Sequence, residues 1–198
     1  MTPISGTISA IVAITVVLFW IVFASIFVFL RSSKTGPDQK RGLVSRLGVG
    51  IQGLGFASVW MSSRFHSLQP PTPPRWVEII LAVAVFVLGA GSCWLEYKSV
   101  RALGKQWAVV ARIMEGHELV TEGPYRFVRN PIYLGMLGML LMTALAFSRW
   151  QTFIVGTVLF AIGTTIRIRT EEKLLRATFG KQFDGYVRRV PAFFPRLF

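Results

Sequence analysis

A polar strip at residues 117–135 carries the residue types best suited to binding a small charged ligand. Pro131 is placed to open a helix, because proline is well tolerated at a first helical position. The exposed backbone N–H groups of a helix start attract an anionic group such as a carboxylate. His117, Tyr125 and Tyr133 add hydrogen-bonding groups and ring faces to the strip. An aromatic face is suited to a cationic ligand such as a sulfonium.

A second charged group, residues 167–172, stands where a later apolar run ends. Arg167 and Glu171 are four residues apart, so they share one face of a helix. The alternative is that the arginines are interfacial anchors and that the glutamates form a solvated face. Taken alone, this group favours the alternative, because cationic helix ends are common in membrane proteins.

Two further features of the sequence do not indicate a functional site. Residues 48–53 read GVGIQG, which matches a dinucleotide-binding fingerprint, but that fingerprint works only between a strand and a helix. Here it lies inside an apolar run, where small residues let helices pack closely. Cys93 is the only cysteine, which excludes an intrachain disulfide or a cysteine metal cluster. The packing interpretation also covers two further pairs, Gly89 with Gly91 and Gly135 with Gly138.

Five apolar runs provide the helices that must position these groups. The chain of 198 residues is 53% hydrophobic and 16% charged, and uncharged runs of about 18 or more residues can span a bilayer as helices. We therefore predict an all-α, polytopic membrane helix bundle of about five transmembrane helices. Residues 1–102 would form three spans, and residues 103–198 a region with a two-helix hairpin and a C-terminal helix. The runs cover residues 4–30, 43–63, 76–95, 131–147 and 150–166, the last continuing as a charged helix to Phe179-Gly180.

The net charge of +13 marks one side of a membrane rather than a nucleic-acid surface. The basic residues lie just beyond the apolar runs, and no nucleic-acid motif accompanies them. With the N-terminus outside, the outer segments would hold only Arg64, Arg75 and Arg149 of the 22 basic residues. We therefore expect a multi-pass protein with its C-terminus and active site on the cytoplasmic side. The runs themselves hold few ionisable residues, which argues against a transporter.

The two polar groups, in this order with a hairpin between them, resemble the isoprenylcysteine carboxyl methyltransferase family and the related phospholipid N-methyltransferases. The first block reads His-x-Leu-Val, then Gly-Pro-Tyr-Arg-x-Val-Arg-Asn-Pro-x-Tyr-x-Gly. The second reads Arg, then Glu-Glu-x-x-Leu, Phe-Gly, Phe-x-x-Tyr and Val-Pro. The resemblance covers roughly residues 103–195 and implies an integral membrane enzyme that uses S-adenosylmethionine.

The resemblance also implies roles for individual residues. Arg167 would be the catalytic residue and would bind the substrate, with Glu171 holding the ammonium group of the cofactor. Aligning the chain on Arg-Thr-Glu-Glu would choose Arg169 as the substrate residue instead, and we favour Arg167 because it shares a helix face with Glu171. The family usually has histidine where this chain has Asn130, which cannot carry a proton at neutral pH. The implied cofactor site comprises His117, Glu118, Leu119, Val120, Tyr125, Asn130, Pro131, Ile132, Tyr133 and Glu171.

The expected reaction is methyl transfer to a lipid-like or prenylated small-molecule acceptor, and membrane lipids are expected to surround the protein. Carboxyl O-methylation of an isoprenylcysteine-type substrate is favoured, because a carboxylate is ionised at neutral pH and needs no base. A phospholipid N-methyltransferase is the alternative, and its ammonium acceptor must first lose a proton to His117 or a glutamate. An NADPH-dependent sterol-type reductase ranks lower, because this chain has Glu171-Glu172 and a Phe-Gly stop where such enzymes have Asp, Cys and Tyr-Gly.

Overall fold

All regular secondary structure in the described part of the chain is helical, which confirms the all-α prediction. The computed structural model describes residues 3–30, 43–62, 74–104 and 118–194. These residues form α1 (Pro3–Phe29), α2 (Leu43–Ser62), α3 (Arg75–Leu103), the 3-10 turn η3 (Gly123–Arg126), α4 (Pro131–Phe147), α5 (Trp150–Phe179) and α6 (Lys181–Arg189).

The helix boundaries follow the predicted ones closely, with α3 as the exception. We expected α3 to end near Leu95, but it continues to Leu103 and stops at Gly104, whose φ is +52°. The additional turns are amphipathic: Glu96 and Val100 are buried on the same face. The helix therefore continues because these turns still have a core to pack against. As predicted, α5 ends at Gly180, whose φ of +49° is the left-handed conformation that glycine adopts readily.

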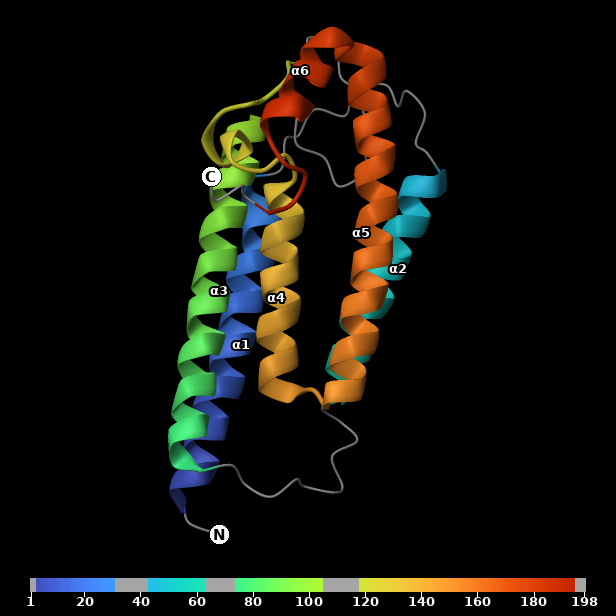
Figure 1. Ribbon diagram of the computed structural model, residues 1–198. Coiled ribbons are helices and arrows are strands. Elements are labelled where there is room, and N and C mark those ends of the chain that lie inside the picture. The colour runs from blue at the N-terminus through green and yellow to red at the C-terminus, as the bar shows by residue number, and fades with distance from the viewer. Residues whose placement is uncertain (1–2, 31–42, 63–73, 105–117, 195–198) are drawn as a thin grey trace.

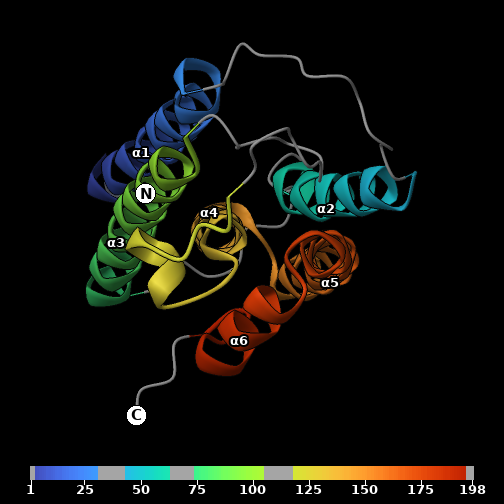
Figure 2. The same ribbon diagram turned by 90° about the horizontal axis from the view of Figure 1, so that it is seen from above.

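The helices form two groups that α4 joins. Helices α1, α3 and α4 lie side by side, and α2 runs antiparallel along α5 (Figures 1 and 2). In the first group Phe23, Val85 and Met139 belong to one buried cluster. A second cluster, which includes Leu140 of α4 and Phe160 of α5, connects α4 to the other group. The fold thus places α4, with the polar strip at its start, at the centre of the bundle.

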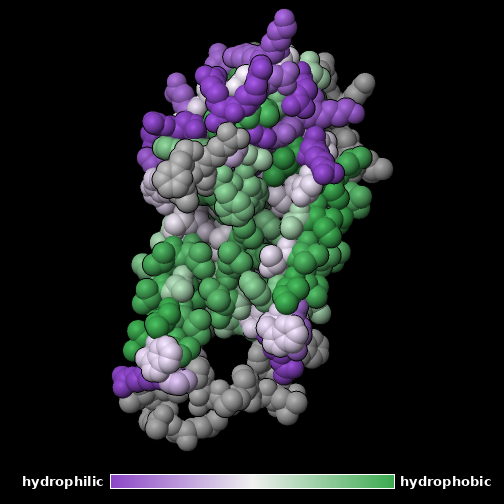
Figure 3. Space-filling view, viewed as in Figure 1, coloured by the Kyte–Doolittle hydropathy of each residue, from purple (hydrophilic) through white to green (hydrophobic). Residues whose placement is uncertain are grey.

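The outer surface of the bundle is suited to lipid. Within the described residues, three helices are long and apolar enough to cross a membrane, with spans at Ile8–Phe29, Arg75–Leu103 and Trp150–Phe179. Helix α4 is apolar but shorter, so the count of five spans stays a prediction, as does the orientation. An apolar band lies between polar ends in Figure 3, and the end that carries α6 is the more extensively polar one.

Small residues line the contact between α2 and α5. A Cβ atom at Gly163 would lie 2.7 Å from both the backbone nitrogen of Gln52 and the carbonyl oxygen of Gly48. The packing interpretation is therefore confirmed for Gly48, and residues 48–53 lie within a helix rather than in a dinucleotide-binding turn. It also holds for Gly89, Gly135 and Gly138. It does not hold for Gly50, Gly53 and Gly91, where a Cβ atom would meet nothing within 4 Å.

We predict that Gly163→Leu destabilises the protein, because the added side chain forces two backbones apart. Overpacking of this kind costs about 1–3 kcal/mol in the free energy of unfolding. The matched control is Gly50→Leu, which makes the same change at an exposed site of α2 with open space around it. Thermal unfolding of both variants in detergent checks the prediction, and equal melting temperatures would contradict the close contact of α2 and α5.

Candidate active site

Arg167 is a buried cation that is held from two neighbouring helices. It lies on α5 and is 7% exposed. Its Nη1 atom donates a hydrogen bond of 2.7 Å to Oε1 of Gln52 on α2. The Nε2 atom of Gln52 in turn donates to the Thr164 hydroxyl at 2.6 Å. The guanidinium carbon lies 4.8 Å from the ring centre of Tyr133 on α4, within the range of a cation–π contact.

Glu171 extends this arrangement by one helical turn. The Tyr133 hydroxyl donates a hydrogen bond to the Glu171 carboxylate. The structure thus brings Tyr133, Arg167 and Glu171 together, a set that joins the first polar block to the second. Arg169 is exposed on another face of α5 and is not part of this cluster. A buried cation and a buried phenol beside a half-buried carboxylate can recognise a ligand that carries both charges.

The remaining predicted cofactor residues, 117–120, precede η3 in the chain. His117 lies outside the described residues. Glu118 is exposed and Val120 is half-buried. Leu119 packs against the cluster of α6 that contains Phe183. Leu119 thus connects the start of the polar strip to α6.

The residue that precedes α4 does not cap this helix with its side chain. Asn130 precedes the helix but makes no cap hydrogen bond; its amide donates instead to the Ala192 carbonyl at 2.9 Å. Pro131 is the first helical residue, as predicted, and is buried. Ile132 packs against the core of α1, α3 and α4, so its side chain does not join the Glu171 cluster. The first backbone N–H groups of α4 are therefore without a side-chain cap among the described residues.

Arg129 ties the strip to the C-terminal segment. Its Nε and Nη2 atoms donate to Oε1 of Glu172 at 3.0 and 2.8 Å. Its Nη1 atom donates to the carbonyls of Val187, at 3.3 Å, and of Val190. Its backbone N–H donates to the Pro191 carbonyl at 2.9 Å. One arginine thus holds the end of α6 over the start of α4.

Two tyrosines reinforce that attachment. The Tyr186 hydroxyl of α6 donates to the Tyr125 carbonyl at 2.6 Å. Burial, with a smaller contribution from the Glu172 charge, raises the pKa of Tyr186 to about 12, although Arg129 acts in the opposite direction. Burial and the charges of Glu96 and Glu171 raise the pKa of Tyr125 well above its ordinary value. Both phenols therefore stay protonated at neutral pH.

The sequence analysis did not identify Gln52 and Arg129 as site residues. Gln52 was part of the sequence set aside as a false fingerprint. A lone amide in an apolar run was the available signal, because polar groups within spans are rare and usually functional or paired. Arg129 gives no such signal, because its partners come from α5 and from the chain after Tyr186.

We predict that Arg129→Met releases the C-terminal segment. Arg129 and Glu172 are only 10% and 21% exposed at their side chains, and breaking a buried pair costs about 3–5 kcal/mol. Hydrogen exchange of residues 181–194, followed by mass spectrometry, should become faster. The control is Arg176→Met, whose pair with Asp184 is 51% and 45% exposed and should matter little. Equal exchange in both variants would contradict the role of Arg129.

Comparisons with known proteins identify the family of the chain. The family model described as phospholipid methyltransferase matches residues 77–182. The cobalt-zinc-cadmium resistance protein CzcN of Cupriavidus metallidurans is 38% identical over 101 residues, covering 50% of this chain and 46% of the relative. Methanethiol S-methyltransferase 2 of Bradyrhizobium diazoefficiens is 36% identical over 200 residues, covering 92% and 74%.

A third relative is named for the activity of the family that the sequence resembles. Protein-S-isoprenylcysteine O-methyltransferase of Schizosaccharomyces pombe is 33% identical over 91 residues, covering 44% of this chain and 37% of the relative. The chain thus spans less than two thirds of the length of this relative and of the metal-resistance protein. The family model covers more than half of the chain, including both polar blocks as far as α6. The resemblance is confirmed, and the chain belongs to the phospholipid methyltransferase family.

Proposed function

We propose that this protein is an integral membrane methyltransferase that transfers a methyl group from S-adenosylmethionine to an apolar, lipid-like acceptor. The observation that carries the proposal is the cluster of Tyr133, Arg167 and Glu171. It joins the two polar blocks at the polar end of the bundle. Family membership supports the methyltransferase activity and disfavours the reductase alternative. The excess of basic residues supports a cytoplasmic active site and an outer N-terminus.

The residues at this cluster fit the amino-acid part of S-adenosylmethionine. Glu171 suits its ammonium group, and the uncapped start of α4 suits its carboxylate. The cofactor supplies a methyl carbon bonded to a positively charged sulfur. The roles of His117, Glu118, Leu119 and Val120 as further cofactor contacts stay proposals that rest on the resemblance.

The residues around the cluster can position an acceptor and exclude water. Gln52 and Tyr133 fix the Arg167 guanidinium, so that it can orient a polar head group without rearranging. The segment at residues 190–194 is fastened to Arg129 and Asn130, where it shields the start of α4. These residues allow two acceptor chemistries. One is a carboxylate held by Arg167, and the other is an amine or a thiol. Of these, the name of the methanethiol relative describes a thiol for that protein.

The proposal is tested with the full-length protein in detergent or nanodiscs. S-Adenosylhomocysteine should raise the melting temperature and NADPH should not, because a ligand stabilises the state that it binds. Methyl transfer from labelled S-adenosylmethionine should then be measured on an S-farnesylcysteine derivative, phosphatidylethanolamine and an alkanethiol. Absence of both a thermal shift and any transfer would refute the proposed function.

We predict that Glu171→Gln weakens S-adenosylhomocysteine binding by about tenfold to a hundredfold. The change keeps the shape of the side chain but removes the charge, and a hydrogen bond to a charged group contributes about 1.5–3 kcal/mol. Isothermal titration calorimetry gives the dissociation constant. The control is Glu122→Gln, the same change at an exposed position before η3. An unchanged dissociation constant for Glu171→Gln would refute its role.

The choice between Arg167 and Arg169 can be tested with one substitution at each position. Lysine keeps the charge but loses the planar group that stacks on Tyr133 and bonds Gln52. Arg167→Lys should therefore lower kcat/KM for the acceptor by about tenfold or more, as loss of one charge-assisted hydrogen bond would. Arg169→Lys should leave it nearly unchanged because Arg169 is exposed. A larger effect at Arg169 would reverse the assignment.

A further inference from the structure

Gln52 is an amide side chain buried within the apolar helix α2. It is 2% exposed, and both ends of its amide group make hydrogen bonds to α5. Its Oε1 atom accepts from Nη1 of Arg167 at 2.7 Å, and its Nε2 atom donates to the hydroxyl of Thr164 at 2.6 Å. Burying an amide costs free energy unless it is hydrogen-bonded. These two bonds offset that cost and hold the side chain in one place.

Thr164 determines which end of the amide faces Arg167. It is 4% exposed and lies three residues before Arg167, so both side chains are on one face of α5. A guanidinium can only donate hydrogen bonds, whereas a hydroxyl can also accept them. The Oε1 atom of Gln52 therefore faces Arg167, and its NH2 group faces Thr164. Turning the amide over would lose the bond to Arg167.

The neutral partner from α2 distinguishes Arg167 from Arg129, which is also mostly buried. Arg129 pairs with the Glu172 carboxylate at 2.8 Å, and that pair carries no net charge. The pair of Arg167 and Gln52 keeps a net positive charge, because an amide binds the guanidinium without neutralising it. Buried charges are usually paired with an opposite charge, so a neutral partner is suited to a site where a ligand brings the negative charge.

The Arg167 guanidinium lies next to the proposed cofactor site. Its carbon is 4.8 Å from the ring centre of Tyr133, whose hydroxyl donates to Glu171. Glu171 is the residue proposed to hold the ammonium group of the cofactor. An anionic group bound at Arg167 would therefore lie beside the cofactor, with Tyr133 in contact with both positions.

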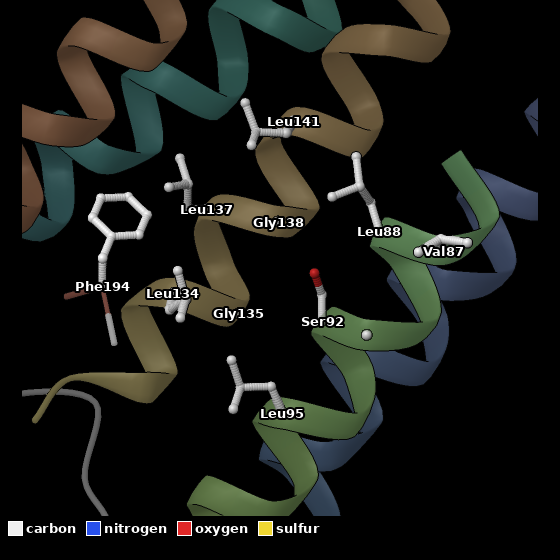
Figure 4. A pocket seen from close by; sticks show the side chains of 11 residues that line it. Val87, Leu88, Ser92, Leu95, Leu134, Gly135, Leu137, Gly138, Leu141 and Phe194 are labelled. Carbon is white, nitrogen blue, oxygen red and sulfur yellow. The ribbon is translucent and has the colours of Figure 1, made fainter. Parts of the chain in front are cut away.

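The apolar groove between α3 and α4 is a separate feature of the fold (Figure 4). It measures about 260 Å³, and its walls include Leu88 of α3 and Leu134 of α4. Gln52 and Arg167 are not among the described residues that line it. Gly91 does line it, and a Cβ atom there would meet nothing within 4 Å. Filling the groove at Gly91 is therefore a control that leaves the pair of Gln52 and Arg167 untouched.

We propose that Gln52, oriented by Thr164, is a positioning residue that fixes the Arg167 guanidinium through a neutral group, so that Arg167 selects a ligand with an anionic group. The inference rests on the proposed methyltransferase function and adds the residue that sets the charge selectivity of the acceptor side. A carboxylate and a phosphate both offer the oxygen atoms that a guanidinium binds.

The test measures binding of two anionic probes, dodecanoate and dodecyl phosphate, and of dodecan-1-ol as their uncharged analogue. The full-length protein is used in a maltoside detergent with S-adenosylhomocysteine present, and native mass spectrometry gives the dissociation constants. We expect the unaltered protein to bind at least one anion about tenfold or more tightly than the alcohol, as one charge-assisted hydrogen bond would provide. The two anions show whether a carboxylate or a phosphate fits better.

Gln52→Glu should remove this preference and leave binding of the alcohol unchanged. The change keeps the shape of the side chain and an oxygen for Nη1 of Arg167, but it adds a negative charge that disfavours a second one nearby. The matched control is Gln151→Glu, the same change at an exposed position of α5, which should keep the preference. Gly91→Leu, which fills the groove, should also keep it.

A comparison with Gln52→Met separates positioning from a purely structural role. This second variant loses the bonds to Arg167 and Thr164 without adding a charge. We expect Gln52→Glu to have the higher melting temperature of the two, because it still binds Arg167, and yet to bind the anions more weakly. A purely structural role would place the two variants in the same order by both measurements.

The outcomes separate the inference from the proposed function. The inference is overturned by an unaltered protein without preference for either anion, by a preference that persists in Gln52→Glu, or by the same order of stability and anion binding in the two Gln52 variants. Each of these leaves the proposed function standing, because S-adenosylhomocysteine binding is measured separately by calorimetry. Absence of that binding in the unaltered protein would refute the proposed function, and the inference with it.

Discussion

The buried guanidinium of Arg167 is the group on which this end of the bundle depends. A charge among apolar helices is stable only where neighbouring groups pair or hydrogen-bond it. Here Gln52 reaches it from α2, and Tyr133 covers it from α4. One side chain of α5 therefore sets the relative positions of three helices. Glu171 takes its place from the same arrangement, because it lies one turn further along α5 and accepts a hydrogen bond from Tyr133.

The small residues between α2 and α5 make this pairing possible. A Cβ atom at Gly48 would lie 2.7 Å from Cγ of Arg167 and 3.0 Å from the Gly163 carbonyl oxygen. Any larger residue there would push α2 away from α5 and take Gln52 out of reach of the guanidinium. The glycines and the buried charge are thus one structural arrangement. A dinucleotide fingerprint would need the same glycines for a different reason, namely a turn around a phosphate.

The sequence predicted the helices well, because bilayer thickness and backbone hydrogen bonding fix the length and composition of a span. It also placed Arg167 and Glu171 on one face, since that relation is local. It could not find Gln52 as the partner of Arg167, because 115 residues separate them and only packing brings them together. The predicted end of α3 was wrong for a related reason. Glu96 looked like the charged end of a span, but its burial depends on α4.

Arg167 and Glu96 are both ionisable groups buried among the helices, but the described residues supply partners for only one of them. The guanidinium is supplied with partners by α2 and α4, whereas the described residues supply none for the Glu96 carboxyl group. Tyr133 faces α5 and Gly135 faces α3, which is expected for residues about 200° apart around a helix. The first turns of α4 therefore separate a guanidinium that contacts groups on two other helices from a buried carboxyl group without a hydrogen-bond partner among the described residues.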